Sequence, residues 1–381
     1  MTAERFVTLT GDDPRLGPHL MGCAGDKAGD EAIRPVLVSS LNPHLFRSQN
    51  GGTAGRELCE WTFEYVPLKA LRRPKLFKVW LLALRPETWV LSLAPMVSVL
   101  GILPAASVDF SGAQVFSAIG GIIALHAAIN LFDDFHDHMR GWDRVDSHGG
   151  ARVLAQGWLK AGEVRALAWV LFLLSCLAGM YILFVRSAGP LSLVAVVAFL
   201  AGLEFAASRF GLKYRGFAEL AAWFMFGPLL TVGLNWALTG GWSVSALALG
   251  ALFGSVALLS IHLKNFESIL IDGQARLQTW PVRAGFDASK TFTVLCAGLV
   301  MFSFALVLVF VSPWPERLLA MVALVSGVGL LLGRVSRIKS PVAGEMRGLY
   351  REALRLAWLL FISTIVGDVI HFWGDQIVSA L

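Results

Sequence analysis

The chain has 381 residues, of which 56% are hydrophobic and only 15% are charged. Soluble domains average about 45–50% apolar and about 25% charged residues, so this composition indicates an integral membrane protein. The net charge of +5 does not indicate nucleic-acid binding, because the basic residues lie in short loops between apolar stretches. The four cysteines form no close-spaced pair, which argues against a zinc site and a disulfide framework.

Residues 1–78 are expected to form a cytosolic, largely irregular extension. The first 56 residues are polar, rich in Gly and Asp, and show no sustained hydrophobic period or signal peptide. From Glu57 to Lys78 aromatic and aliphatic residues mix with basic ones, which favours a segment lying on the membrane surface. Pro67 and Pro74 argue against one long helix there.

Residues 79–381 are expected to form the membrane domain, an all-α bundle of nine transmembrane helices. A span needs roughly 20 mostly apolar residues to cross the hydrocarbon core. Gly and Pro signals join the hairpins. The predicted spans are 87–105, 112–132, 164–185, 189–207, 217–238, 244–264, 290–311, 316–334 and 352–373.

The distribution of Lys and Arg predicts the orientation of these spans. One set of loops carries twenty-four of them, whereas the opposite set holds only Arg186 and Arg317. Because positive loops stay in the cytosol, the N-terminus and every long charged loop are predicted to be cytosolic.

The cytosolic end of the second span carries an acidic cluster. Asn130 and Asp134 are four residues apart and share one helix face, and Asp133 and Asp137 do the same. Such close carboxylates repel each other unless a cation binds, and Mg²⁺ favours carboxylate, phosphate and water oxygens. A solvated acidic loop is the simpler alternative. His136 and His138 leave a transition metal as a weaker one, since no second ligand set has suitable spacing.

A second polar cluster lies at the cytosolic end of the sixth span, four spans later. Asn265, Ser268 and Asp272 are three and four residues apart and share a face, and Glu267 is offset by about 100°. Ionisable residues at the ends of bundled spans are costly unless they face a cavity or each other. The two clusters together therefore indicate a Mg²⁺-diphosphate site.

Basic residues follow both clusters and are candidates for stabilising the negative charge of a diphosphate leaving group. The positive-inside distribution alone also explains most of them. They are Arg140, Arg144, Arg152, Lys213, Arg215, Arg276 and Arg283.

Several runs resemble the UbiA superfamily of membrane prenyltransferases, and most closely its 1,4-dihydroxy-2-naphthoate prenyltransferase branch. The run from Asn130 to Asp137, followed by Arg140-Gly141 and Asp143, is similar to the family's first aspartate-rich motif. The resemblance covers about residues 84–375 and extends to further runs. These are Leu84-Arg85-Pro86-Glu87-Thr88, Gly149-Gly150-Ala151-Arg152-Val153-Leu154 with Gly157, Leu212-Lys213-Tyr214-Arg215-Gly216 with Glu219, Phe226-Gly227-Pro228-Leu229, Asn265 with Asp272, and Pro281-Val282-Arg283 with Gly285.

This resemblance implies a nine-helix bundle whose two Asp motifs face each other across a cytosolic cavity. Mg²⁺ would bridge them to an isoprenyl diphosphate, the prenyl tail would lie in a groove open to lipid, and an aromatic acceptor would attack the allylic carbocation. Carried onto this chain, the catalytic residues are Asp134, Asp137, Asp272, Lys213 and Arg215. The metal ligands are Asp133, Asp134, Asp137 and Asp272, and the substrate-binding residues are Asn130, Asp133, Arg140, Arg152, Asn265, Glu267 and Ser268.

The chain departs from the family pattern in its second motif. Ser268 stands where the first of two Asp is usual, which leaves Asp272 as the carboxylate of the motif. Glu267, one position away, is expected to replace the missing carboxylate in part by reaching the metal through water. Fewer anionic oxygens should weaken Mg²⁺ binding. Other departures are Phe205 for a Tyr, Ser208-Arg209 for a Pro pair, and Leu277 and Gln278 where a Lys or Arg is common.

Two other classes of function compete with the enzyme. An inactive family member acting as a membrane scaffold would not need paired acidic clusters. A transporter would place its polar site near the middle of the membrane, often at broken helices, rather than at cytosolic helix ends. The predicted function is therefore Mg²⁺-dependent prenyl transfer to an aromatic acceptor.

Overall fold

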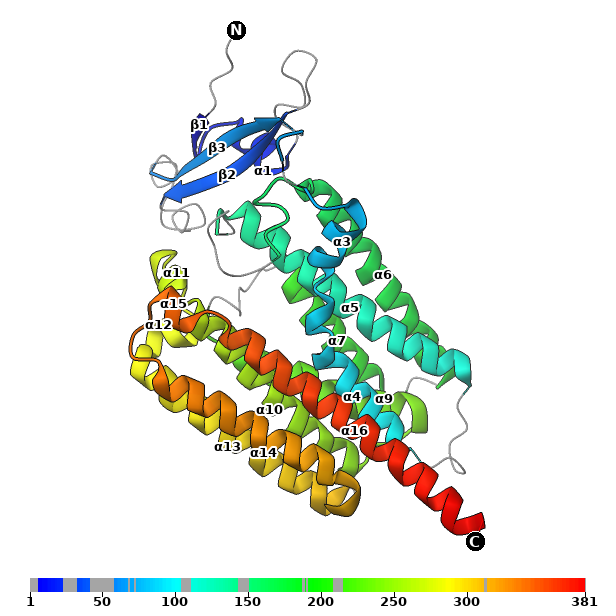
Figure 1. Cartoon of the computed structure of the whole chain (residues 1–381). Helices are drawn as coiled ribbons and strands as arrows, with labels where there is room; N and C mark the ends of the chain where they lie inside the picture. The colour runs from blue at the N-terminus through cyan, green and yellow to red at the C-terminus, as the bar shows by residue number, and fades with distance from the viewer. Residues whose placement is uncertain are drawn as a thin grey trace.

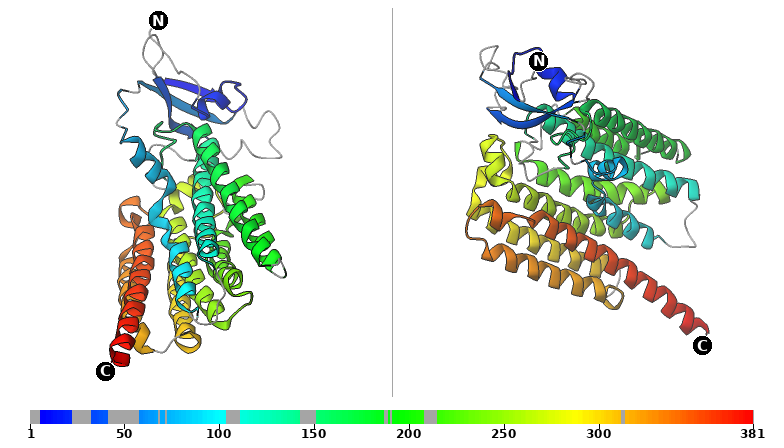
Figure 2. Two further views of the ribbon diagram at one scale, coloured as in Figure 1. Left: turned by 90° about the vertical axis from the view of Figure 1, so that its right-hand side faces the viewer. Right: turned by 45° about the horizontal axis from the view of Figure 1, so that its top comes forward.

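The structure of the protein is a computed structural model, in which long helices run side by side and a small sheet lies at one end of them (Figure 1). In all views the sheet and the far end of the last helix lie at opposite ends of the molecule (Figures 1 and 2). The described residues are 6–22, 33–41, 58–67, 69–71, 73–103, 111–142, 151–186, 189, 191–207, 215–311 and 314–380.

The sheet is antiparallel and has the strand order β1-β3-β2, formed by β1 (Phe6–Thr10), β2 (Ile33–Leu41) and β3 (Glu60–Pro67). On the central strand β3, Trp61 and Phe63 are fully buried, and Glu60 and Glu64 alternate with them. The short helix α1 (Leu16–Leu20) completes this small core with Leu16 and Leu20.

The predicted irregular extension is therefore wrong for these strands. The predicted membrane-surface segment is wrong for residues 60–67, because their apolar side chains alternate with a period of two and point into the sheet core. The only part of that segment with exposed apolar side chains on a helix, among the residues described, is the start of α3 (Leu76–Leu84), where Leu76 and Phe77 are exposed.

The sheet docks on the chain segment that follows the first acidic motif. Ser40 donates from Oγ to the carbonyl of Gly141 at 2.6 Å, and Arg34 donates to the carbonyl of Gly157 at 2.8 Å. In the other direction, His138 donates from Nε2 to the carbonyl of Leu20 at 2.9 Å. The sheet and α1 therefore hold both ends of the loop that connects α5 (Gly112–Met139) and α6 (Ala161–Val185).

Helices α5, α6, α10, α13 and α14 and the composite α8–α9 segment give six described helices that are long and apolar enough to cross a membrane. The shorter apolar helices α4 and α7 and the long helix α16 complete the bundle. The bounds are α4 (Val90–Gly101), α5 (Gly112–Met139), α6 (Ala161–Val185), α7 (Leu191–Ala207), α8 (Ala218–Phe224), α9 (Leu230–Thr239), α10 (Val244–Glu267), α13 (Phe286–Phe310), α14 (Trp314–Arg337) and α16 (Leu349–Ala380).

Each predicted span overlaps one of these helices or the composite segment, and short helical pieces link them. The number of spans that cross the membrane, nine, stays a prediction for α4, α7 and α16. The connecting pieces are η2 (Pro86–Thr88), η4 (Met225–Leu229), α11 (Ile269–Gln274), α12 (Trp280–Ala284) and α15 (Ala343–Met346).

Helix α10 is the centre of the bundle and packs against α4, α8, α9, α13 and α16. Its approach to the α8–η4–α9 segment depends on small residues: a Cβ at Gly227, Gly250 or Gly254 would overlap the backbone of the facing helix. Gly227 and Pro228 also interrupt the regular helix, and η4 is a π-helical turn with non-helical dihedrals at Gly227. This break lies beside the cavity described below.

A substitution at Gly141 tests whether the sheet docks as described. Its φ is +72°, and a Cβ at this position would overlap the indole of Trp61. Gly141→Ala should lower the free energy of unfolding by about 2 kcal/mol or more, because left-handed backbone and overlap both penalise alanine. Thermal unfolding in detergent, together with proteolysis of the sheet, measures the effect.

Gly240→Ala is the matched control, because Gly240 has a φ of +78° and open space around its Cβ position. It should show only the backbone penalty and leave the sheet resistant to protease. Equal effects of the two substitutions would contradict the docking of the sheet on Gly141.

Candidate active site

One cavity of about 580 Å³ lies between α5, α6, α7, the α8–η4–α9 segment and α10. Most of its wall is apolar, with side chains such as Ile182, Val194, Ala198, Leu229 and Leu234. Polar and charged side chains also line it, and they come mainly from the η2–α4 region and from the C-terminal parts of α5 and α10. They include Arg85, Thr88, Ser92, His126, Asn130, Asp133, Lys264, Asn265 and Tyr350.

Arg85 is placed at this charged part of the cavity by a sharp change of direction between α3 and η2. It has a left-handed backbone with φ of 50° and precedes Pro86, which cannot continue helix α3. The side chain is buried and pairs with the Asp134 carboxylate, and its Nη1 lies 3.9 Å from Asp133 Oδ2. A buried guanidinium needs such partners, so Arg85 ties the start of the bundle to α5.

The first acidic motif is divided between the cavity and the helix packing behind it. Asp133 lines the cavity, and its Oδ2 lies 3.7 Å from Lys264 Nζ on α10. Asp134 is buried against Arg85, and its second oxygen, Oδ2, has no hydrogen-bond partner among the described atoms. Asp137 lies one turn beyond Asp133 and is half-buried.

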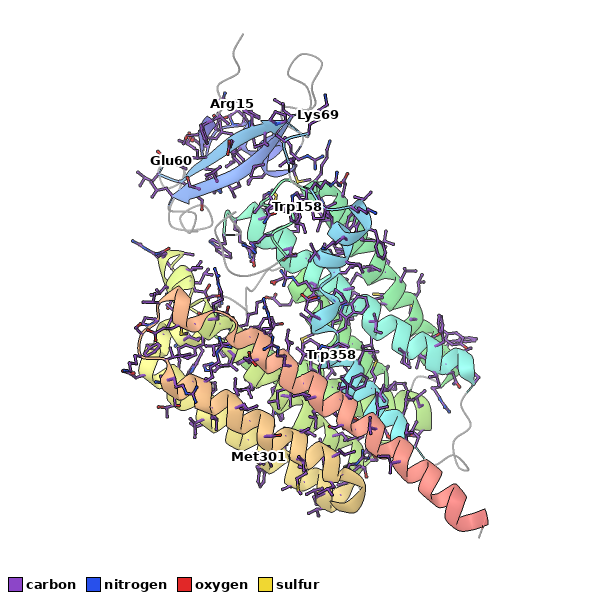
Figure 3. All side chains as sticks on the ribbon, viewed as in Figure 1. Arg15, Glu60, Lys69, Trp158, Met301 and Trp358 are labelled. Atoms are coloured by element: carbon purple, nitrogen blue, oxygen red, sulfur yellow. The ribbon has the colours of Figure 1, made fainter. Side chains whose placement is uncertain are left out.

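Asn130 is held against the loop before α4. Its Nδ2 donates to the carbonyl of Leu84 at 3.2 Å and to the hydroxyl of Thr88 at 3.1 Å. The side-chain amide therefore stabilises the η2 turn, and it also contributes to the cavity wall. Trp358 of α16 also contacts this turn, because its indole donates to the carbonyl of Glu87 at 3.1 Å. Figure 3 shows Trp358 beside α4.

The second motif contributes residues of α10 to the cavity wall, but not the predicted carboxylate of Asp272. Lys264 and Asn265 line the cavity, and Asn265 donates from Nδ2 to Glu219 Oε1 at 2.9 Å. Glu219 is buried, and its other oxygen has no hydrogen-bond partner in the described part of the chain. Ser268 is the C-cap of α10, and Asp272 lies on α11, where its Oδ2 accepts from the Thr279 hydroxyl at 3.2 Å.

Glu267 has a different partner from the one predicted. Its two carboxylate oxygens accept from the backbone N–H of Gly348 at 2.7 Å and of Tyr350 at 3.0 Å, so it caps the start of α16. A carboxylate there satisfies two free N–H groups and complements the helix dipole. Glu267 therefore positions Tyr350, which lines the cavity, and does not line the cavity itself.

The structure does not bring the four predicted metal ligands together. Within the described residues no three or more His, Cys, Asp and Glu side chains form a group placed to hold a metal ion. Asp133 and Asp134 both form ion pairs with Arg85, whereas Asp272 lies on the separate helix α11. This arrangement is still suited to Mg²⁺, which commonly takes one or two carboxylates and completes its shell with phosphate and water oxygens.

The comparisons with known proteins assign the family. The sequence profile of the UbiA prenyltransferase family matches residues 93–365. The chain belongs to this family.

Relatives with curated names match part of the chain at low identity. A 1,4-dihydroxy-2-naphthoate octaprenyltransferase of Mycobacterium tuberculosis is 28% identical over 204 residues, covering 52% of this chain and 66% of the relative. A UbiA prenyltransferase domain-containing protein 1 homolog of Drosophila melanogaster is 27% identical over 239 residues, covering 61% and 64%. The chain thus spans slightly less than two thirds of the length of either relative.

Solved structures share the fold. A UbiA homolog from Archaeoglobus fulgidus bound to GPP and Mg²⁺ has a TM-score of 0.55 at 16% identity, and the match covers 76% of this chain and 99% of that one. The structure bound to DMAPP and Mg²⁺ has a TM-score of 0.53 at 16% identity, with the same coverage. These matches show that the helical bundle has the UbiA fold.

The basic residues at the cavity differ from those singled out in the sequence. Arg85 and Lys264 line it, whereas the predicted Arg140, Arg152 and Arg215 do not. Arg140 lies over the ring of Trp142 at 5.0 Å, Arg152 has a φ of 54°, and Arg215 is exposed. The predicted Lys213 lies outside the described residues. Arg85 lies in one of the runs that resemble the family, but neither Arg85 nor Lys264 is among the basic residues that the sequence singles out.

Glu267→Gln separates capping of α16 from metal binding. The amide keeps one acceptor oxygen, so one N–H group at the start of α16 loses its partner. We expect the free energy of unfolding to fall by about 1 kcal/mol, with no change in the Mg²⁺ dependence of donor binding. Thermal unfolding and binding of a labelled isoprenyl diphosphate measure the two effects.

The exposed Glu60→Gln on β3 is the control and should change neither quantity. Loss of Mg²⁺ dependence with unchanged stability in Glu267→Gln would instead support the metal-binding role predicted from the sequence.

Proposed function

We propose that this protein transfers an isoprenyl group from an isoprenyl diphosphate to an aromatic acceptor and releases diphosphate. The observation that carries the proposal is the composition of the cavity wall, which combines Arg85, Lys264 and Asp133 with a largely apolar remainder. An isoprenyl diphosphate has the same division into a charged head and an apolar tail. A scaffold has no need of such a cavity.

Arg85 and Lys264 are suited to hold the diphosphate, because both are cationic and both line the charged part of the cavity. Arg85 offers a planar array of donors, and Lys264 offers a point charge. The side-chain amides of Asn130 and Asn265 lie in the same wall and supply further polar groups. Asp133 lies between the two cations and moderates the repulsion between them.

The carboxylates of the first motif fit a Mg²⁺ ion that binds with the donor. Asp133 lines the cavity, and Asp134 has a buried oxygen without a hydrogen-bond partner among the described residues, so these two are the best-supported ligands. Asp137 and Asp272 remain proposed ligands because they match the aspartate motifs of the family. When bound, Mg²⁺ neutralises the negative charge that develops on the diphosphate.

The reaction breaks the bond between prenyl C1 and the diphosphate oxygen, and both electrons leave with the diphosphate. Arg85 and Lys264 stabilise this charge in a cavity of low dielectric constant, where such interactions are strong. The apolar wall holds the tail and keeps water from the allylic cation. A ring carbon of the acceptor then forms the new bond to C1, and the ring loses a proton.

Asp133→Asn tests the metal part of the proposal. In wild-type protein Mg²⁺ should strengthen binding of a labelled isoprenyl diphosphate, and in the variant this enhancement should fall about tenfold or more. Binding in the presence of a chelator should be unchanged or tighter, because Arg85 and Lys264 lose a competing carboxylate. Titration of the donor with and without Mg²⁺ measures both.

Asp287→Asn is the control, since Asp287 is an exposed carboxylate in the first turn of α13 and does not line the cavity. It should bind donor as wild type does. An undiminished Mg²⁺ enhancement in Asp133→Asn would contradict the proposed metal site.

We also propose that the sheet and the charged part of the cavity face the cytosol. The twenty-four loop Lys and Arg residues against two support this orientation. A water-soluble diphosphate made in the cytosol then reaches the cavity directly.

In protein lacking the four native cysteines, an impermeant thiol reagent outside intact cells should label Gly241→Cys and miss Arg337→Cys. Labelling of Arg337→Cys alone would show the opposite orientation and contradict the proposal.

A further inference from the structure

His126 of α5 lies in the cavity wall between two hydroxyl groups. Its Nδ1 is 2.7 Å from Ser92 Oγ, and its Nε2 is 3.2 Å from Thr88 Oγ1. All three side chains line the cavity and are at most 6% exposed. The proposed reaction gives these side chains no contact with the diphosphate or the metal, so this buried hydrogen-bond chain needs its own explanation.

The hydrogen bonds around Thr88 assign the tautomer of His126. The Thr88 hydroxyl donates to the carbonyl of Arg85 at 2.8 Å, and it accepts from Asn130 Nδ2 at 3.1 Å. Its only proton is therefore used, and His126 must donate to it from Nε2. Nδ1 then carries the lone pair, and it accepts from the Ser92 hydroxyl.

The Ser92 oxygen is left open toward the cavity. Ser92 Oγ forms no other hydrogen bond with the described residues, so its lone pairs are available to a hydroxyl donor in the cavity. The charged side chains that line the cavity are Arg85, Asp133 and Lys264, and the proposed reaction assigns all three to the donor and its metal. Phe226 packs on His126, with 5.2 Å between ring centroids, and lines the cavity as an aromatic surface.

We propose that Ser92 and His126 act together as the general base that takes the hydroxyl proton of a phenolic or naphtholic acceptor. The inference rests on the proposed prenyl transfer to an aromatic acceptor and adds to it the residues that remove the proton of a ring hydroxyl. The geometry needed for a general base is a hydrogen-bond chain to the proton it removes, and Ser92 supplies this link to Nδ1. Thr88 positions the imidazole, because it accepts from Nε2.

The proton transfers balance as follows. The acceptor hydroxyl gives its proton to Ser92 Oγ while the Ser92 proton moves to His126 Nδ1, which leaves a phenolate and an imidazolium. The C1–O bond to diphosphate breaks to give the allylic cation, and the phenolate ring carbon then forms its bond to prenyl C1. The resulting ring ketone loses its C–H proton to the released diphosphate, and the imidazolium returns its proton through Ser92 to the oxygen.

Ser92→Ala and His126→Gln test this base with two acceptors of different acidity. With an acceptor hydroxyl of pKa about 10, each variant should lower kcat about a hundredfold, the lower range for a general base. With an acceptor already ionised at the assay pH, the loss should shrink to less than about fivefold, because no proton has to be removed. Binding of the isoprenyl diphosphate should stay within about twofold of wild type, which also shows that each variant is folded.

Ser98→Ala is the matched control, since Ser98 is a buried serine of α4 that does not line the cavity. It should behave as wild type with both acceptors. An equal loss with both acceptors in Ser92→Ala and His126→Gln, or no loss with either, would overturn the base. A wild-type protein that transfers to no hydroxylated arene, although it binds donor, would overturn the proposed function and this inference with it.

Discussion

The structure depends on the pairing of charges where long apolar helices meet. Arg85 contacts Asp134 and Asp133 of α5, and Asp133 also lies near Lys264 of α10. Charged groups with so little solvent are stable only with partners, so these contacts bring the α3–η2 junction, α5 and α10 together. Because the three elements are far apart in the sequence, the same pairing brings the first and second motifs to one part of the cavity.

The packing of the helices leaves room beside these charges. Glycines let α10 approach the α8–η4–α9 segment closely, while the break at Gly227 and Pro228 interrupts that segment beside the cavity. A membrane bundle gains little from burying one apolar surface against another, since lipid is equally apolar. Close packing on one side and a cavity on the other are therefore both compatible with stability.

The sequence was a sound guide to the helices and a weaker one to individual contacts. Hydropathy located segments that overlap every long helix, because apolar length is a local property. The strand Glu60–Pro67 was misread, since basic residues after it made a longer window look amphipathic while its own period of two was missed. Glu267 could not be assigned from spacing, because its partners Gly348 and Tyr350 are some eighty residues later.

The same limit applies within the site. The placement of Asn130 and Asp133 on the cavity wall follows from their motif and helix. Arg85 needed the left-handed turn before Pro86 to reach Asp134, and Lys264 needed α10 to pack within reach of α5. Both are tertiary outcomes, and counting loop charges for topology cannot distinguish a residue that binds substrate from one that only stays in the cytosol.

The central claim is that one cavity holds the donor, with its head at the charged residues and its tail against the apolar wall. An isoprenyl diphosphate with a diazirine at the far end of its tail tests this directly by photolabelling and peptide mapping. We expect label on cavity residues of α7 and α9, such as Val194, Ala198 and Leu234, and loss of label when unlabelled donor and Mg²⁺ are in excess. Label confined to exposed side chains of α13, such as Phe302 and Val309, or label that excess donor does not displace, would contradict it.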